Sequence, residues 1–304
     1  MNNEKGYKPL VPDILVHERA FQSYQAECSY TFYLLNQENE SVEGLFTFFV
    51  VNNVATTAVK APFGFVEMLF FDKWSFAYIV TKVELFFKEL GIKTLSIRSL
   101  PDFYQSAKIS IAKECLLLAN FYCLENLCNY YIPVDGNDFE SKIAPSQLGR
   151  MNRSLNAGFH TKCLGHEQLE AVYRFILECR AERNYGGLVS LMDLQRITAM
   201  FPDRYFLFVV LDKDESIAAA NISVKMSDDI LYTWYSHHLF CFNSFSPVIL
   251  LHKYIYDFCM GRNIKFIDLS VAKEGDGNEK ISLQKFKKRI GGIESIRTEF
   301  RKEI

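Results

Sequence analysis

The chain has 304 residues, of which 49% are hydrophobic and 23% are charged, and its formal net charge at pH 7 is −2. This length accommodates two domains that each bury their own core, and the composition is typical of a globular protein. The small net charge excludes a general electrostatic attraction to nucleic acid, although a local basic patch over 285–289 stays open.

The first half begins with three short β-branched and aromatic runs, which predict an antiparallel meander. These runs span 30–35, 44–51 and 57–61, and turn-prone segments separate them. Next come a helix over 75–90 that ends at Gly91, a strand over 92–97, a helix over 107–121 and a strand over 127–133. The polar run 135–138 predicts the end of a first domain, residues 1–135.

The second half begins with a linker, residues 136–158, that contains a helix over 145–157 and ends at Gly158. A second domain, residues 159–304, follows. Its expected strands span 160–164, 205–212, 217–226, 230–238, 264–269 and 295–300. Its expected helices span 166–184, 191–201, 246–261 and 282–290, the last ended by Gly291-Gly292.

A strand, loop, helix and strand over 232–269 repeat the order of elements found about 172 residues earlier. The stretch 92–95 aligns with 264–267 without a gap, and Phe86 aligns with Phe258. Such a strand–helix–strand unit is right-handed and packs its helix on one face of a sheet. The sequence therefore predicts an α/β fold with mixed sheets, built by duplication as two tandem domains.

The element order of the second domain resembles that of the GNAT superfamily of acyl-CoA-dependent N-acyltransferases. The doubled arrangement resembles the Fem-type aminoacyltransferases and covers nearly the whole chain. Three patterns carry the resemblance: Ala61-Pro62-Phe63-Gly64; Arg150-Met151-Asn152-Arg153-Ser154 with Gly158; and Ile267-Asp268-Leu269 followed by Leu283-Gln284-Lys285-Phe286-Lys287 and Gly291-Gly292. The resemblance implies an N-acyltransferase that moves an acyl group from acyl-CoA, such as acetyl-CoA, to a small-molecule or peptide amine bound between the domains.

In the resembling fold, the strand before the long helix diverges from its neighbour and the acyl thioester enters the wedge. Amides at the helix N-terminus then hold the pyrophosphate. Here we expect Ser246 to cap that helix, with Pro247 in its first turn. The expected donor-binding residues are Asn243, Ser244, Ser246 and Lys287. Segment 239–245 contains no glycine, so a Fem-type transfer from aminoacyl-tRNA to a cell-wall precursor peptide stays open as the alternative.

Acyl transfer to an amine needs a base, a site for the oxyanion and a proton donor. Strand alternation places Tyr232, Trp234, Ser236 and His238 on one face of strand 230–238, and Thr233, Tyr235 and His237 on the other. His237 or His238 is the candidate base, and Tyr232 or Tyr235 is the candidate acid. Asp268, near the carboxyl end of its strand, is a further catalytic candidate.

Three residues are candidates for substrate contacts: Glu67, Arg153 and Trp234. Structural roles remain as alternatives, such as a turn acceptor for Asp268 or a rim salt bridge for Glu67. Because segment 69–74 before the first long helix is mainly apolar, we expect the first domain to be degenerate. The lack of glycine in segment 239–245 leaves a non-catalytic binding module that keeps the fold as a third alternative.

The sequence suggests neither a metal nor a covalent nucleophile, because it lacks His-x-x-x-His, Cys-x-x-Cys and Gly-x-Ser-x-Gly patterns. Its eight scattered cysteines favour reduced thiols and a cytoplasmic location. The first ten residues are polar and lack the apolar centre of a signal peptide. We therefore expect a monomer without a membrane span.

Overall fold

The computed structural model describes residues 10, 14–25, 28–273 and 280–304. The polar N-terminal stretch lies outside these residues, apart from Leu10. The chain divides into two compact units: unit 1 contains Met1–Leu127 and Ser295–Ile304, and unit 2 contains Cys128–Glu294. Within the described ranges, no helix has the length and apolar character needed to cross a membrane.

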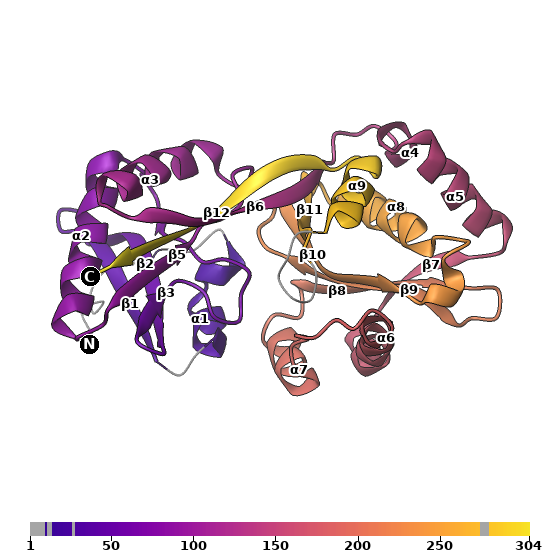
Figure 1. The fold of residues 1–304 in the computed structure, drawn as a ribbon, viewed down its shortest axis with the longest axis horizontal. Coiled ribbons are helices and arrows are strands. Elements are labelled where there is room, and N and C mark those ends of the chain that lie inside the picture. The colour runs from indigo at the N-terminus through magenta and orange to yellow at the C-terminus, as the bar shows by residue number, and fades with distance from the viewer. Residues whose placement is uncertain (1–9, 11–13, 26–27, 274–279) are drawn as a thin grey trace. The chain divides into compact units, whose positions relative to one another are not determined.

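Unit 1 is a mixed sheet with helices packed against it (Figure 1). The strands follow the order β1-β2-β3-β5-β12, and β4 pairs with β2. All neighbours are antiparallel except β3 and β5, which are parallel. Its elements are η1 Leu15–His17, α1 Arg19–Gln25, β1 Ser29–Asn36, β2 Ser41–Val51, β3 Val54–Thr56, β4 Glu67–Met68, α2 Lys73–Glu89, β5 Thr94–Arg98 and α3 Ser106–Leu118, with the ends of β6 Tyr122–Pro133 and β12 Ile293–Glu303.

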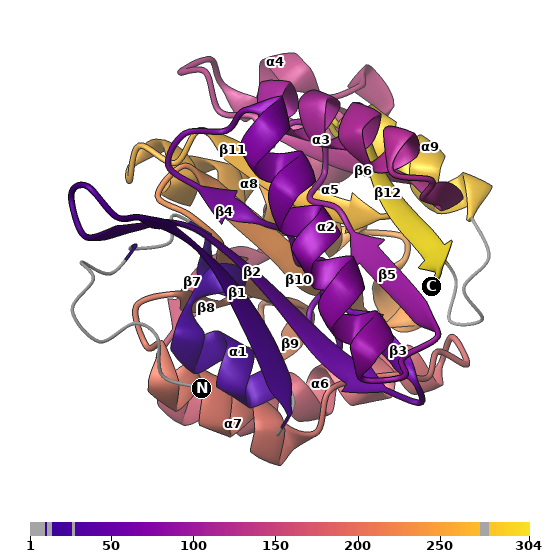
Figure 2. The same cartoon turned by 90° about the vertical axis from the view of Figure 1, so that its left-hand side faces the viewer.

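Helix α2 packs on the sheet of unit 1 (Figure 2), and phenylalanine rings lie between the two. The rings of Phe87 and Phe48 lie 5.5 Å apart, and those of Phe86 and Phe32 lie 5.2 Å apart. Helix α2 begins two residues earlier than expected because the Asp72 carboxylate accepts hydrogen bonds from the first-turn amides.

Unit 2 is also a mixed sheet, with α8 on one face and α6 on the other (Figure 1). The strands follow the order β6-β11-β10-β9-β8-β7. Strands β10 and β11 are parallel, and the other neighbours are antiparallel. Its elements are α4 Phe139–Lys142, α5 Pro145–Asn156, β7 His160–Leu164, η2 His166–Gln168, α6 Leu169–Ala181, α7 Leu191–Met200, β8 Tyr205–Leu211, β9 Ile217–Lys225, β10 Ile230–His238, η3 Phe240–Phe242, α8 Pro247–Met260, β11 Phe266–Val271 and α9 Ile281–Arg289.

The same parallel strand–helix–strand unit occurs in both halves, as the repeat predicted. In unit 1, β3 and β5 pair through the crossover helix α2, and in unit 2, β10 and β11 pair through α8. The expected strand at 57–61 is wrong, because β3 ends at Thr56 and the chain then enters a loop. Gly64 allows that loop to fold back, since an added Cβ would lie 2.0 Å from the Thr57 carbonyl oxygen.

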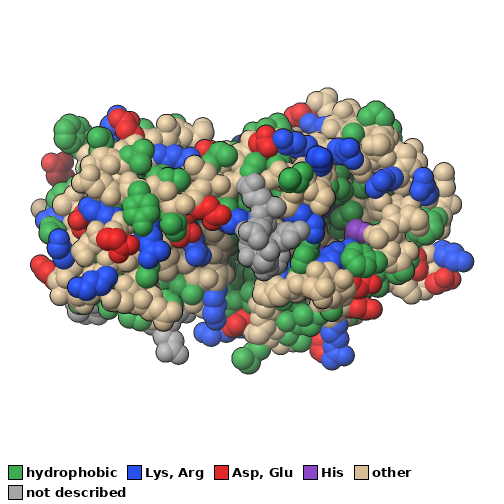
Figure 3. All heavy atoms as spheres, in the orientation of Figure 1, with side chains coloured by type: hydrophobic (Ala, Val, Ile, Leu, Met, Phe, Trp, Pro, Cys, Tyr) green, Lys and Arg blue, Asp and Glu red, His purple; other side chains and the backbone are tan. Residues whose placement is uncertain are grey.

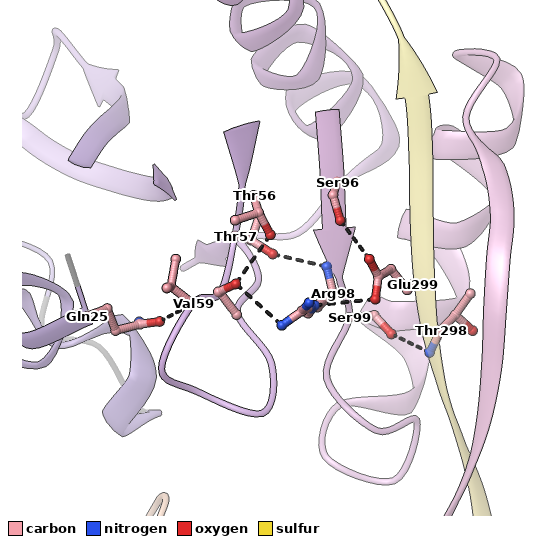
Figure 4. Close-up of polar contacts among 10 residues, drawn as sticks. Gln25, Thr56, Thr57, Val59, Ser96, Arg98, Ser99, Thr298 and Glu299 are labelled. Carbon is pink, nitrogen blue, oxygen red and sulfur yellow. Dashed lines mark hydrogen bonds and ion pairs between the residues drawn. The ribbon is translucent and has the colours of Figure 1, made fainter. Parts of the chain in front are cut away.

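This loop closes the end of the β3–β5 pair in unit 1 (Figure 4). The amide of Thr57 donates to the Ser96 carbonyl, and the Arg98 amide donates to the Thr57 hydroxyl. The amide of Gly64 then donates to the Arg98 carbonyl. On the other side of β5, Glu299 accepts from Ser96 at 2.9 Å and from Arg98 at 3.3 Å. The loop therefore continues the hydrogen bonding of the β3–β5 pair beyond Thr56.

The division into units differs from the boundaries expected at 135 and 159. Helix α5, expected as a linker, packs against α8 within unit 2. Strand β12 runs on from unit 2, and its residues 299–303 pair with β5 of unit 1. In return, β6 starts in unit 1 and its residues 129–133 pair with β11 of unit 2. The sheet of unit 1 thus contains β12, which follows α9, and the sheet of unit 2 contains β6, which follows α3.

Candidate functional site

The parallel strands β10 and β11 separate after a short paired stretch. Only Ile230–Tyr232 pairs with Phe266–Asp268, although β10 continues to His238 and β11 to Val271. Each strand also carries an irregularity where they separate. The register with β9 shifts between Thr233 and Tyr235, and the register with β6 shifts between Asp268 and Val271. Such bulges bend strands, so the two strands open into a wedge.

A cavity of about 230 Å³ occupies this wedge. It is lined by residues of α6, β10, β11, α8 and α9 and of the segments that follow α6 and β11: Arg180, Tyr185, Thr233, Trp234, Tyr235, Ser236, His237, Val248, His252, Leu269, Ser270, Val271, Lys273, Leu283, Phe286 and Lys287. Five consecutive residues of β10 contribute to it, so the predicted alternation of two faces is wrong. The bulge at Trp234 breaks the two-residue period, and the ring of Trp234 stacks on that of Tyr235 at 4.8 Å.

Asp268 holds the bulge of β11 and does not line the cavity. Its carboxylate is fully buried and accepts hydrogen bonds from the Asn129 amide at 2.9 Å and from the Ser270 backbone at 2.7 Å. The second bond fixes Ser270 in the left-handed region, with φ of 65°. Tyr232 also lies outside the cavity lining, and its hydroxyl is 3.0 Å from the Ser270 hydroxyl.

Lys287 extends from α9 into the wedge and is only 7% exposed. Its ammonium donates to the carbonyls of Ser270 at 3.0 Å and Val271 at 2.8 Å. Burial lowers the pKa of Lys287 to about 7, against the opposing effect of the Asp268 charge. Its neutral and charged forms therefore coexist near neutral pH.

The histidines near the wedge are neutral at pH 7. Burial and, to a smaller extent, the nearby Arg180 guanidinium together lower the pKa of His237 to about 3. The Nε2 atom of His237 accepts a long contact of 3.5 Å from Arg180. Burial also lowers the pKa of His252, to about 4. The pKa of His238 is likewise lowered from its usual value by burial. His252 donates through Nδ1 to the Val248 carbonyl, which fixes its tautomer.

A larger cavity of about 620 Å³ shares part of this lining and extends along the loop between β10 and α8. Asn243 and Ser246 line it. The prediction that the Ser246 side chain caps helix α8 is wrong. Ser246 is in the left-handed region with φ of 54°, and its hydroxyl donates to the Asn243 carbonyl instead of receiving a helix amide. The loop, which lacks glycine, forms the short helix η3. Several of its backbone amides and the Ser246 hydroxyl donate to carbonyls of the loop itself.

The amides of this loop are largely occupied within the protein. Those of Phe242, Asn243, Phe245 and Ser246 donate to carbonyls of the loop itself, and that of Phe240 donates to the Glu182 carboxylate. A backbone cradle for pyrophosphate at these amides is therefore blocked.

Basic side chains surround the larger cavity. Arg150, Arg183 and Lys280 line it, and Arg150 approaches the Ser246 hydroxyl at 3.5 Å. In the view of Figure 3, Lys and Arg side chains gather on the unit that carries α9, with a histidine in a hollow beside them. Two loop rings, Phe242 and Phe245, pack against Phe159.

The remaining predicted residues have structural partners. Glu67 is 5% exposed and accepts from His17 Nδ1 at 2.8 Å, while His17 Nε2 accepts from the Phe65 amide. Arg153 ties α5 to the loop through the Ser244 carbonyl at 2.9 Å. His238 lies 2.9 Å from the Asn243 side chain. Of the expected substrate contacts, Trp234 alone lines a cavity described above.

Sequence reasoning missed Arg180, Tyr185 and His252, which all line the smaller cavity. Arg180 lies in the last turn of α6, where a basic residue is normally explained by the helix dipole. His252 lies in an apolar helix and gives no periodic signal of its own. Only the opening of β10 from β11 brings these side chains together.

No model of a known protein family matches the chain, and no curated protein sequence matches it. Solved structures do match. FemX shares 13% identity over 91% of this chain and 88% of that chain, with a TM-score of 0.69. This is a tandem GNAT fold. The tandem GNAT protein from the clavulanic acid biosynthesis pathway shares 10% identity with this chain. The match covers 91% of this chain and 83% of that chain, with a TM-score of 0.54.

L-PGS from Bacillus licheniformis shares the tandem GNAT fold at 10% identity, over 91% of this chain and 84% of that chain, with a TM-score of 0.61. The fold assigned from the sequence, with its Fem-type relatives, is thus confirmed. At these identities the likeness concerns the fold, which is an acyltransferase-type fold, and the reaction has to be argued from the site.

Proposed function

We propose that the chain transfers an acyl group from an activated donor to an amine, and that the reacting carbonyl lies in the wedge of unit 2. The separation of β10 from β11 carries this proposal. Beyond Tyr232 the two strands no longer pair, so an extended acyl chain has room between their edges. Polar groups and three basic side chains line this space, and its lining includes none of the loop rings Phe240, Phe242 and Phe245, which favours a transferase over a binding module without activity.

Lys287 is the residue best placed for proton transfer, in preference to His237. With a pKa of about 3, His237 is a weak base, whereas a lysine with a pKa of about 7 holds an accessible lone pair at neutral pH. In the proposed step, neutral Lys287 takes a proton from the attacking amine as the new C–N bond forms. The resulting ammonium then protonates the leaving sulfur or oxygen as its bond to the acyl carbon breaks.

Acyl-CoA is the first candidate donor, with Arg150, Arg183 and Lys280 as side-chain ligands for its phosphates. These cations replace the loop amides, which the protein itself occupies. Isothermal titration with acetyl-CoA tests this donor directly, since the expected complex weakens when Arg150 is replaced by glutamine. Absence of binding at millimolar acetyl-CoA would remove acyl-CoA from the proposal.

The occupied loop amides favour a second candidate donor, an aminoacyl ester of tRNA. Such a donor presents one terminal phosphate and a ribose to the cavity, so it does not require a pyrophosphate cradle. Filter binding of aminoacyl-tRNA at increasing salt separates the two donors, because neutralised phosphates make the affinity fall steeply with salt. Retention that is absent, or insensitive to salt, would exclude tRNA.

The pH dependence of acyl transfer tests the role of Lys287. We expect kcat/KM to rise about tenfold per pH unit up to about pH 7 and then to level off, because only the neutral amine accepts a proton. Lys287→Met should abolish transfer at every pH. Lys285→Met, on the exposed side of the same helix, should keep the wild-type profile. A profile without a step near pH 7 would contradict this role.

A further inference from the structure

The smaller cavity has basic side chains in its lining and no acidic one. Among the described residues that line it, Arg180, Lys273 and Lys287 are basic, and none is aspartate or glutamate. Asp268 lies behind the bulge of β11 and interacts with Lys287. Among the described residues, only Tyr185 and Tyr235 exert a comparable influence on the charge of Arg180.

Arg180 is held in place by contacts that leave its charge uncompensated. Its guanidinium lies 5.8 Å from the ring centroids of both Tyr185 and Tyr235. It donates to the Gly186 carbonyl and approaches the neutral imidazole of His237 at 3.5 Å. Its Nε atom is buried and has no hydrogen-bond partner. Within the described part of the chain, no carboxylate forms an ion pair with it.

A half-buried guanidinium normally has an anionic partner, because removing its charge from water costs free energy that only an opposite charge or full hydrogen bonding restores. Burial lowers the pKa of Arg180, which reflects the same cost. A guanidinium offers five N–H donors in a plane, more than its two protein acceptors use. Its geometry suits a carboxylate, which it binds through two parallel hydrogen bonds.

We propose that Arg180 binds a carboxylate of the substrate in the wedge and so makes the enzyme specific for an acidic reactant. This proposal rests on the acyl-transfer function assigned to the same cavity. A volume of about 230 Å³ suits a small carboxylate-bearing group. The aromatic rings of Tyr185 and Tyr235 fix the guanidinium, which reduces the entropy lost on binding.

The carboxylate has two possible sources, the transferred acyl group or the acceptor amine. Binding of matched pairs to the full chain distinguishes them. Succinyl-CoA against butyryl-CoA tests the acyl group, and L-glutamate against L-glutamine together with glycine against glycinamide tests the acceptor. We expect the acidic member of at least one pair to bind about tenfold to a hundredfold more tightly, as charged hydrogen bonds require.

Variants of Arg180 assign that preference to the guanidinium. Arg180→Gln should reduce the preference for the acid to less than about twofold, and Arg180→Lys should restore only part of it, because an ammonium lacks the planar fork. Arg174→Gln is the matched control, since Arg174 lies on the same helix, α6, and forms an exposed ion pair with Glu170. This control should keep the full preference.

The outcomes separate this inference from the acyl-transfer proposal. Equal binding of acid and neutral partner in every pair by the wild type would overturn the inference, as would a preference that survives in Arg180→Gln. The wild-type comparison decides even when a variant does not fold. Acyl transfer without any preference for the acidic partner supports the proposed function and removes the inference. A carboxylate preference that depends on Arg180, without any transfer, keeps the inference and removes the acyl-transfer proposal.

Discussion

The Lys287 residue is 7% exposed, and its amine donates hydrogen bonds to two backbone carbonyls. Those carbonyls satisfy its donors but carry only partial charges, so burial still disfavours the ammonium. Ser246 illustrates the same dependence on surroundings in another way. Its position before Pro247 is typical of a helix cap, yet φ of 54° turns its hydroxyl toward the Asn243 carbonyl.

Stability should report the lowered pKa of Lys287. Below about pH 7 the lysine is protonated in both folded and unfolded chains, so pH does not change its contribution. Between about 7 and its usual value of 10.5 the unfolded chain holds more protons, so the free energy of unfolding rises with pH. We expect the wild type to gain about 1 kcal/mol per pH unit relative to Lys287→Met between pH 7 and 9 in urea titrations. A constant difference over this range would contradict the lowered pKa.

Helix α9 positions Lys287 through the way it ends. The amides of Gly291 and Gly292 donate back to the carbonyls of Lys288 and Lys287, which is a Schellman motif. Gly291 has φ of 90°, and a Cβ on Gly292 would lie 2.6 Å from the Lys287 carbonyl oxygen. The Gly291-Gly292 pair of the GNAT-like pattern therefore sets the end of the helix that carries Lys287.

Gly292→Ala should destabilise the protein by about 1–3 kcal/mol, because the backbone of α9 has to move to admit a methyl group. It should also lower acyl transfer by displacing Lys287. Gly149→Ala is the matched comparison, since Gly149 lies inside α5 with nothing within 4 Å of an added Cβ. That variant should gain about 0.5–1 kcal/mol. Thermal unfolding measures both, and equal effects would argue against the close contact at Gly292.

At the scale of the molecule, the exchange of β6 and β12 makes the fold differ from two consecutive domains. The last residues of the chain complete the sheet of unit 1, where Phe300 is 2% exposed. An expected boundary at 159 assigns those residues to the second domain instead. Pairing of β12 with β5 is a contact between distant parts of the sequence, and local patterns carry no signal of it.

Phe300→Ala should cost about 3–5 kcal/mol, the range for removing a buried phenylalanine ring. Hydrogen exchange should accelerate in β5 of unit 1 and stay unchanged in β10 and β11 of unit 2. Ile296→Ala, at a residue of the same strand that is 37% exposed, should have a much smaller effect. Faster exchange confined to unit 2 would contradict the assignment of β12.

Most of the strands and helices, the repeated strand–helix–strand unit and the GNAT likeness were determined by the sequence alone, whereas α1, β4, α4 and the position of β3 were not. Hydrophobic periodicity and turn residues act over a few neighbours, so strands such as 160–164 and 230–238 were predicted at their observed bounds. The tertiary structure alone decided the chemistry of the site. The bulges at Trp234 and Ser270, the lowered pKa of Lys287 and the burial of the Arg180 Nε atom all depend on which surfaces the folded chain brings together, because desolvation and strand pairing arise from neighbours distant in sequence.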